Sequence, residues 1–183
     1  MTKTLPILIL FLLATSFAPA KLVKTKVSDG VTVSLPGTMY AMTPDDIAQR
    51  YPSVRAPLGA YTDQERTVDF SVNISATKWP DGDVDLAAKF FKSGLTNLYD
   101  RLDMISEGQQ ILYKKKFIFY EFESRINGDR RKQGFTDPIL KYTFIQYLVE
   151  KDRTLVFTFS CAKDMRGDWQ ETAKEIMKSI RVK

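Results

Sequence analysis

Apolar and polar side chains alternate strictly along residues 67–77, where Val68, Phe70, Val72, Ile74 and Ala76 occupy every second position. Successive side chains of a β-strand point to opposite faces of its sheet. A period of two therefore predicts a strand with one buried face and one solvent-exposed face.

Two later segments carry the period of an α-helix instead. In the first, apolar residues recur at spacings of three and four, at Val84, Ala87, Ala88, Phe91, Leu95, Leu98 and Leu102. In the second, one stripe is formed by Trp169, Ala173, Ile176, Met177 and Ile180. These spacings predict an amphipathic helix of about 18 residues that starts at Val84, and a closing helix from about Trp169 to Ile180.

A short helix is indicated at residues 43–46, which read T-P-D-D. Threonine is a favoured N-cap, proline suits the first helical position, and carboxylates are stabilised beside the positive end of the helix dipole. The pair Tyr51-Pro52 limits this helix to about two turns, because a residue before proline avoids the helical conformation.

Four further segments are rich in aromatic and β-branched residues and are predicted to be strands, namely 104–112, 117–126, 142–149 and 155–161. Asp29-Gly30 predicts a tight turn next to an earlier strand. The first half of segment 117–126 is apolar on both faces, so we expect it to be central in a sheet that is covered on both sides. The fold class is therefore α+β, a mainly antiparallel sheet flanked by helices on both faces, or α-β-α sandwich.

The first twenty residues follow a pattern of their own. Lys3 precedes an apolar run of about 13 residues, and Ala18-Pro19-Ala20 comes next. A charged start, an apolar centre and an A-x-A site predict a signal peptide that is cut between Ala20 and Lys21. The apolar run is shorter than the roughly 20 residues that a membrane-spanning helix needs. We therefore expect residues 21–183 to form one domain, without a transmembrane span, in the periplasm or secreted.

The length, charge and composition of the chain limit the kinds of function that it can have. Removal of twenty residues from 183 leaves 163, a usual length for one domain with a substantial core. The net charge of +5 falls to +4 with the loss of Lys3, a mild excess that names no partner. Cys161 is the only cysteine, which excludes an intramolecular disulfide, and its position indicates a buried, inert thiol. The chain has no histidine, the commonest general base and metal ligand, so we expect no catalytic residue, metal or cofactor.

The order of the elements resembles that of the Mog1/PsbP-like superfamily, which includes PsbP and DcrB proteins. The matching features are V-T-V-S-L-P-G at residues 31–37, a long amphipathic helix after an alternating strand, and W-x6-I-x3-I at Trp169, Ile176 and Ile180. They cover nearly all of the mature chain and are structural positions rather than a catalytic signature. The resemblance implies an α-β-α sandwich used mostly for binding and assembly. The chain departs from the pattern in its long, proline-bearing segment 40–61 and in having no tryptophan soon after Pro36.

A carboxylate pair offers one alternative function. Glu121 and Glu123 lie two residues apart on one predicted strand and so share a face, where they could serve as acid and base in a carboxylate-only hydrolase. Arg125 is next on that face and offers a charge partner. A solvated strand end is therefore the favoured interpretation.

Two basic clusters are the candidate surface sites, Lys114, Lys115, Lys116, Arg130, Arg131 and Lys132. If residues 117–126 form one strand, the clusters lie roughly 33 Å apart at about 3.3 Å per residue. Binding of an anionic lipid surface or a polyanion is a second alternative function. Nucleic acid is not expected as a partner, because binding of its backbone favours a continuous basic stripe with stacking aromatics.

The sequence D-G-D-V-D at residues 81–85 looks like the start of a calcium loop. Its sixth position is Leu86, where the turn needs glycine, and its twelfth is Lys92, where a bidentate glutamate belongs. A turn followed by the acidic start of a helix fits these residues better.

The favoured function is therefore that of an exported, non-catalytic binding or accessory protein of the cell envelope or secreted space. Its expected partner is another protein or a small ligand. Because connections between elements commonly carry recognition, we expect the contact surface first in residues 40–61 and 127–137.

Overall fold

The computed structural model describes residues 21–51, 55–79, 83–127 and 137–183. The strands in these ranges are β1 Leu22–Ser28, β2 Val31–Pro36, β3 Tyr40–Ala41, β4 Gly59–Thr62, β5 Val68–Ile74, β6 Arg101–Leu112, β7 Lys115–Ile126, β8 Ile139–Val149, β9 Thr154–Ala162 and β10 Arg181–Val182. The helices are α1 Pro44–Arg50, α2 Val84–Leu98, the 3-10 turn η1 Lys163–Met165 and α3 Arg166–Lys178.

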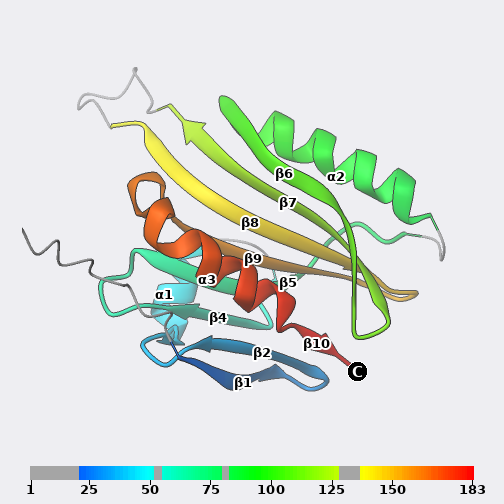
Figure 1. The fold of residues 1–183 in the computed structure, drawn as a ribbon, viewed down its shortest axis with the longest axis horizontal. Helices are drawn as coiled ribbons and strands as arrows, with labels where there is room; N and C mark the ends of the chain where they lie inside the picture. Colours follow the sequence, from blue (N-terminus) through cyan, green and yellow to red (C-terminus); the bar gives the residue numbers. More distant parts are fainter. Residues whose placement is uncertain (1–20, 52–54, 80–82, 128–136) are drawn as a thin grey trace, which may run out of the picture.

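The strands form two antiparallel sheets (Figure 1). The main sheet has seven strands in the order β3-β4-β5-β9-β8-β7-β6, and every neighbouring pair is antiparallel. The small sheet has three strands in the order β1-β2-β10. The predicted α+β class with a mainly antiparallel sheet and helices on both faces is confirmed.

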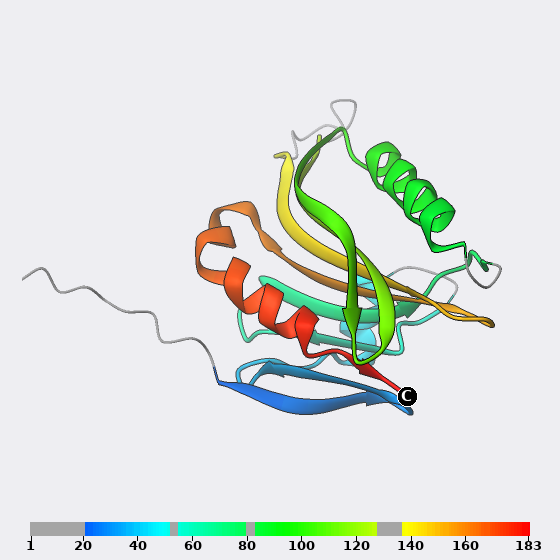
Figure 2. The ribbon, with the colours of Figure 1, turned by 45° about the vertical axis from the view of Figure 1, so that its right-hand side comes forward.

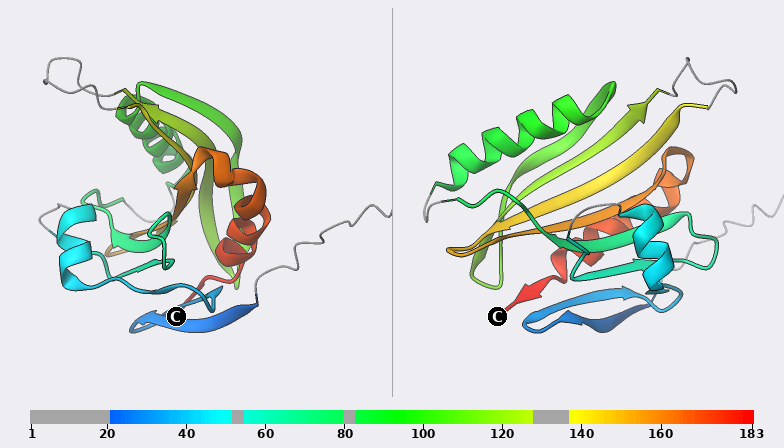
Figure 3. Two further views of the ribbon diagram at one scale, coloured as in Figure 1. Left: turned by 90° about the vertical axis from the view of Figure 1, so that its left-hand side faces the viewer. Right: turned by 180° about the vertical axis from the view of Figure 1, so that it is seen from behind.

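The helices divide unequally between the two faces of the main sheet. Helix α3 lies on one face, and α2 and α1 lie on the other, with α2 over the β6 side of the sheet and α1 beside β4 and β5 (Figure 3). The small sheet lies below the main sheet, next to the C-terminal end of α3 (Figure 2). We call the two faces of the main sheet the α3 face and the α1/α2 face.

The larger core fills the space between the α3 face, helix α3 and the small sheet. It joins β2, β5, β9 and α3 through Val33, Phe70, Phe159 and Ile176, all nearly inaccessible to solvent. A second core lies under α2 on the opposite face, where Phe91 stacks on Tyr147 with ring centroids 4.1 Å apart. Strand β7 contributes to both cores, as its two apolar faces predict.

Two glycines fix the geometry of the small sheet. Gly30 adopts a φ of 80° in the turn between β1 and β2, a conformation that side-chain-bearing residues rarely take, which confirms the predicted tight turn. At Gly59, where β4 begins, an added Cβ would lie 2.5 Å from the side chain of Val27 in β1. The absence of a side chain there therefore lets the chain pass close to the small sheet.

The structure moves several predicted boundaries. Helix α2 has 15 residues rather than about 18, because Tyr99 is already extended and Leu102 pairs with Ser124 in the β6–β7 ladder. Helix α3 begins at Arg166, directly after the 3-10 turn, rather than at Trp169. The short strands β3, β4 and β10 were not predicted, since two to four residues are too few to establish a period.

Within the described ranges, no helix combines the length and the apolar character that crossing a bilayer requires.

Candidate binding site

The α1/α2 face of the main sheet carries a strip of polar side chains between its two helices. On β5 the strip consists of Asp69, Ser71 and Asn73, which alternate with the buried Val68, Phe70 and Val72. On β9 it continues with Ser160 and Thr158, which pair in register with Asp69 and Ser71. The solvent-exposed face predicted for the strand at residues 67–77 is the floor of this strip.

Helix α1 forms one wall of the site, and its start is built as the sequence predicts. Thr43 accepts a hydrogen bond from the backbone of Asp46, and the Asp46 carboxylate accepts from the backbone of Thr43, which completes a capping box. The hydrogen bond from the Thr43 hydroxyl is the main cause that lowers the pKa of Asp46. Arg66 pairs with the second oxygen of Asp46 at 2.9 Å and so ties the turn before β5 to this helix.

The end of α1 points its side chains at the strip. The Arg50 guanidinium forms an ion pair with Asp69 and donates to the backbone carbonyl of Arg66 at 2.9 Å. Tyr51 is bonded through its side chain to Ser71. Burial is the main cause that raises the pKa of Tyr51, and the nearby Asp69 acts in the same direction. The Tyr51 hydroxyl therefore stays neutral and polar at physiological pH.

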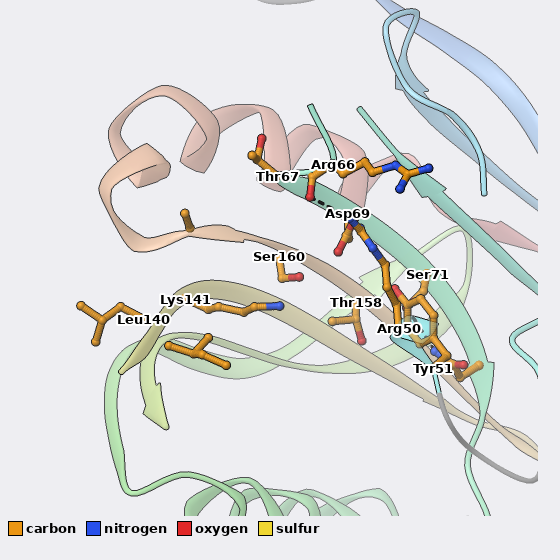
Figure 4. A pocket seen from close by; sticks show the side chains of 13 residues that line it. Arg50, Tyr51, Arg66, Thr67, Asp69, Ser71, Leu140, Lys141, Thr158 and Ser160 are labelled. Carbon is orange, nitrogen blue, oxygen red and sulfur yellow. Dashed lines mark hydrogen bonds and ion pairs between the residues drawn. The ribbon is translucent and has the colours of Figure 1, made fainter. Parts of the chain in front are cut away.

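These elements border an open recess of about 560 Å³, which we call the α1 recess (Figure 4). It is lined by Arg50, Tyr51, Arg66, Thr67, Asp69, Ser71, Asn73, Ile139, Leu140, Lys141, Thr158, Ser160 and Ala162. Arg50 and Tyr51 enter it from the end of α1, and Lys141 extends into it from β8. No carboxylate among the described residues lies within ion-pairing distance of Lys141.

A second recess of about 740 Å³, the β8–β9 recess, adjoins the first at Asn73, which lines both. It is lined by Arg55, Asn73, Ile74, Ser75, Ala76, Lys78, Asp152 and Arg153. Arg153 is held by Glu150 at 2.9 Å. The two recesses therefore lie end to end along β5.

An apolar flank of α2 borders the strip on the opposite side. Asp85 accepts a hydrogen bond from Gln109 of the edge strand β6, and Lys92 donates one to Glu107 of the same strand. These bonds fix which side of α2 faces β6. At 100° per residue, Phe90 projects to the other side, away from β6. Phe90 is 50% exposed and packs edge-on against Trp79 at 5.2 Å.

The predicted carboxylate pair is not a solvated strand end, and this prediction was wrong. Glu121 is 2% exposed beneath α3, where its carboxylate accepts from Tyr142 at 2.9 Å, from Ser106 at 2.7 Å and from Gln170. Burial, together with this carboxylate, raises the pKa of Tyr142. Three donors therefore occupy Glu121, and they link α3, β6 and β8 to β7.

Glu123 is occupied as well, although by other residues than Arg125. Lys163 and Arg166, at the start of the η1–α3 segment, pair with its two oxygens at 2.7 and 2.8 Å. Their hydrogen bonds are the main causes that lower the pKa of Glu123. Both carboxylates lie on the α3 face, away from the two recesses, so the structure separates the predicted hydrolase pair from any cavity described above.

The basic clusters predicted as surface sites have different outcomes. Lys114, Lys115 and Lys116 lie at the turn between β6 and β7, where Lys114 and Lys116 are exposed and Lys115 pairs with Glu150 at 2.6 Å. Arg130, Arg131 and Lys132 lie outside the described residues, as do Ala18 and Ala20 of the predicted cleavage site. Lys21 is exposed directly before β1.

The remaining candidates are structural. Cys161 is 1% exposed, which confirms that the thiol is buried as predicted, and burial raises its pKa to about 12. Asp83 accepts from the backbone of Leu86 at 3.2 Å and so caps α2, while residues 81 and 82 lie outside the described ranges. Among the described residues, no three metal-ligating side chains gather in one place.

Sequence reasoning missed the two recesses. The lining of the α1 recess comes from the end of α1, the turn before β5, β5 itself, the start of β8 and the end of β9, and that of the β8–β9 recess from Arg55, residues 73–78 and the turn between β8 and β9. The one indication in the sequence was the row of polar residues that alternates with apolar ones along residues 67–77. It predicts a solvent-exposed face of the strand, but it does not predict which other elements lie next to that face. Segment 40–61, expected to carry recognition, does contribute Arg50, Tyr51 and Arg55 to the lining.

No protein-family model matches the chain, and no curated protein matches its sequence. Solved structures are similar to it in fold. The cyanobacterial PsbP protein (CyanoP) from Synechocystis sp. PCC 6803 aligns with a TM-score of 0.60 and 14% identity over 92% of this chain and 96% of its own. The Ran-binding protein Mog1p of Saccharomyces cerevisiae aligns with a TM-score of 0.55 and 10% identity over 89% of this chain and 96% of its own. At these identities the likeness concerns the fold alone, and on that level it confirms the resemblance: the chain has the Mog1/PsbP-like fold.

Proposed function

We propose that this chain is an exported, non-catalytic binding module that takes its partner on the α1/α2 face of the main sheet. The observation that carries the proposal is the polar strip between α1 and α2, where two recesses adjoin along β5. Ligands bind in concave surfaces, where polar groups fix their orientation. Mog1p, which shares the fold, is a Ran-binding protein by name, so binding is one use to which this architecture is put.

The state of the two carboxylates supports a non-catalytic role. A glycosidase needs a pair of carboxyl groups that flank a substrate cleft. Here Glu121 accepts from three side chains and Glu123 is paired with two cations. Both are therefore engaged in holding α3 to the sheet.

Export rests on the first twenty residues, with their charged start, apolar run and A-x-A site. We expect the mature protein to begin at Lys21 and to be found in the periplasm or the medium. Its partner is another protein or a small ligand of that compartment.

Site-specific cross-linking in the producing cell tests the binding proposal. A photo-reactive amino acid is placed at Ser160, in the α1 recess, and in a matched variant at Glu171, which is 83% exposed on α3. We expect an adduct in the envelope or secreted fraction from the Ser160 position and none from the Glu171 position. Adducts of equal yield from both positions, or none at Ser160, would contradict a partner site on the α1/α2 face.

Mass spectrometry of the same material tests export separately. We expect a chain whose first residue is Lys21. A chain that keeps Met1 and stays in the cytosolic fraction would remove the exported part of the proposal.

A further inference from the structure

The two recesses together form a cationic trough. Among the residues that the structure describes, six positively charged side chains line them, Arg50, Arg55, Arg66, Lys78, Lys141 and Arg153. Two carboxylates also line them, Asp69 and Asp152. The lining is thus richer in positive charge than the chain as a whole, which has 27 basic residues against 22 acidic ones.

Two of these cations are the most available to a ligand. Lys78 and Lys141 are exposed, and neither is in an ion pair with a described residue. Three arginines are already paired, Arg50 with Asp69, Arg66 with Asp46 and Arg153 with Glu150. These pairs fix the positions of the three arginines. Lys141 lines the α1 recess and Lys78 lines the β8–β9 recess, so each recess contains one of the two lysines.

The floor of the trough offers hydrogen bonds rather than an apolar surface. Asn73, Thr158 and Ser160 present amide and hydroxyl groups along β5 and β9, whereas Ser71 is 2% exposed and bonded to Tyr51. Asn73 donates to the hydroxyl of Ser71 at 3.1 Å, which orders this part of the floor. Groups of this kind pair with hydroxyl, carboxylate and sulfate oxygens.

The trough does not resemble a nucleic-acid groove. Single-stranded nucleic acids are bound by aromatic side chains on which successive bases stack. Among the described lining residues the one aromatic is Tyr51, which is half-buried and bonded to Ser71. Charge without stacking platforms favours an anionic chain that carries no bases.

The shape of the trough favours a linear ligand. The part of β5 between Asp69 and Ile74 alone measures roughly 16 Å at about 3.3 Å per residue. Lining residues extend beyond both of these points, from Arg66 to Lys78. A single small anion would fill only part of this length.

From the charge, the floor and the shape together, we infer that the trough binds a linear anionic polysaccharide, with carboxylate or sulfate groups at Lys141 and Lys78 and sugar hydroxyls on the β5–β9 floor. This inference rests on the proposed function for the position of the site on the α1/α2 face, and it names a polysaccharide in place of the protein or small ligand proposed there.

Heparin fragments serve as the probe, and binding is measured by titration calorimetry on the mature chain. The trough variant is Lys78→Ala with Lys141→Ala, and the control is Lys114→Ala with Lys116→Ala at the β6–β7 turn. All four lysines are exposed, so the two variants lose the same charge without loss of a packed side chain. We expect the trough variant to bind at least about tenfold more weakly and the control within about twofold of the parent chain, since only the former loses direct contacts.

Salt dependence adds a second readout. Polyanion binding releases counterions, so the logarithm of the affinity falls linearly with the logarithm of the salt concentration. Each lost contact reduces the slope by roughly 0.7 to 0.9 on the scale known for nucleic acids. We expect the slope to fall by about 1.5 in the trough variant and to stay nearly unchanged in the control.

Several results would overturn the inference. Equal losses in the two variants would mean attraction by net charge rather than binding in the trough. Single-stranded DNA or vesicles of anionic phospholipid that bind as tightly as heparin would assign the trough to another class of partner. If heparin does not bind while the Ser160 position still gives its cross-linked adduct, the polysaccharide inference fails and the binding proposal stands.

Discussion

The two faces of the main sheet are covered in opposite ways. On the α3 face, helix α3 and the small sheet close over the strands, and the polar groups beneath them, such as Glu121, are bonded to neighbouring side chains. On the α1/α2 face the two helices leave a strip between them, where hydroxyls, an amide and cations line two recesses. The α3 face thus stabilises the fold through buried contacts, whereas the α1/α2 face leaves polar groups available to a partner.

The comparison also separates two kinds of charged cluster. On the α3 face Glu121 and Glu123 meet their donors and cations within the protein, so neither carboxylate is left for a ligand. On the α1/α2 face the arginines Arg50, Arg66 and Arg153 are paired with acids as well, whereas the two lysines that line the recesses are in no ion pair with a described residue. A charged cluster therefore points to function when its charges are not balanced internally, and to stability when they are.

The largest expected difference between the faces concerns aromatic truncation. Phe159 is fully buried on the α3 face between Tyr142 and Trp169, whereas Phe90 is 50% exposed on α2. We expect Phe159→Ala to lower the free energy of unfolding by about 3–5 kcal/mol, because it leaves a cavity in the larger core. Phe90→Ala should cost less than about 1 kcal/mol, since little packing is lost. Urea denaturation measures both, and similar costs would contradict the difference in cover between the two faces.

The next effect concerns the buried carboxylate. Glu121→Gln replaces an acceptor of three hydrogen bonds by an amide whose nitrogen faces donors, so we expect a loss of roughly 2 kcal/mol in the free energy of unfolding. Glu171→Gln is the matched control on the exposed side of α3 and should change stability by less than about 0.5 kcal/mol. If the two substitutions cost the same, Glu121 does not hold α3 to the sheet in the way its contacts indicate.

The sequence predicted the parts of this comparison that depend on local pattern. The alternation along residues 67–77, the stripe of α2 and the capping box at Thr43 are each contained within one element, and each is confirmed in type. The partners of Glu121 could not be predicted, because Gln170 lies 49 residues away and only the packing of α3 brings it there. The recesses were missed for the same reason, since their lining comes from separate elements that meet only in the folded chain.

A smaller effect is expected at the wall of the α1 recess. Thr43→Ala removes the side-chain acceptor of the capping box, and we expect it to lower the free energy of unfolding by about 1 kcal/mol. Thr96→Ala in α2 is the matched control, because its hydroxyl donates to the carbonyl of Lys92 within the helix and caps no helix end. In a hydrogen-exchange experiment we expect the α1 amides to exchange faster in Thr43→Ala than in the parent chain. In Thr96→Ala the exchange rate of the α1 amides should stay unchanged. Unchanged exchange in α1 would mean that tertiary contacts, rather than the cap, hold this wall.

The smallest effect is a dependence on pH that belongs to the α3 face. Lys163 and Arg166 hold the pKa of Glu123 below the ordinary 4.5, so its ionised form is stabilised by folding. A lowered folded-state pKa contributes stability that is present above pH 4.5 and is lost as the pH falls through the lowered value. We expect the parent chain to exceed Glu123→Gln in free energy of unfolding by up to about 1 kcal/mol at pH 7, and the difference to shrink towards pH 3. A double-mutant cycle with Lys163→Ala isolates the pair, and a coupling energy that does not decrease with acid would show that the contribution of Glu123 is not electrostatic.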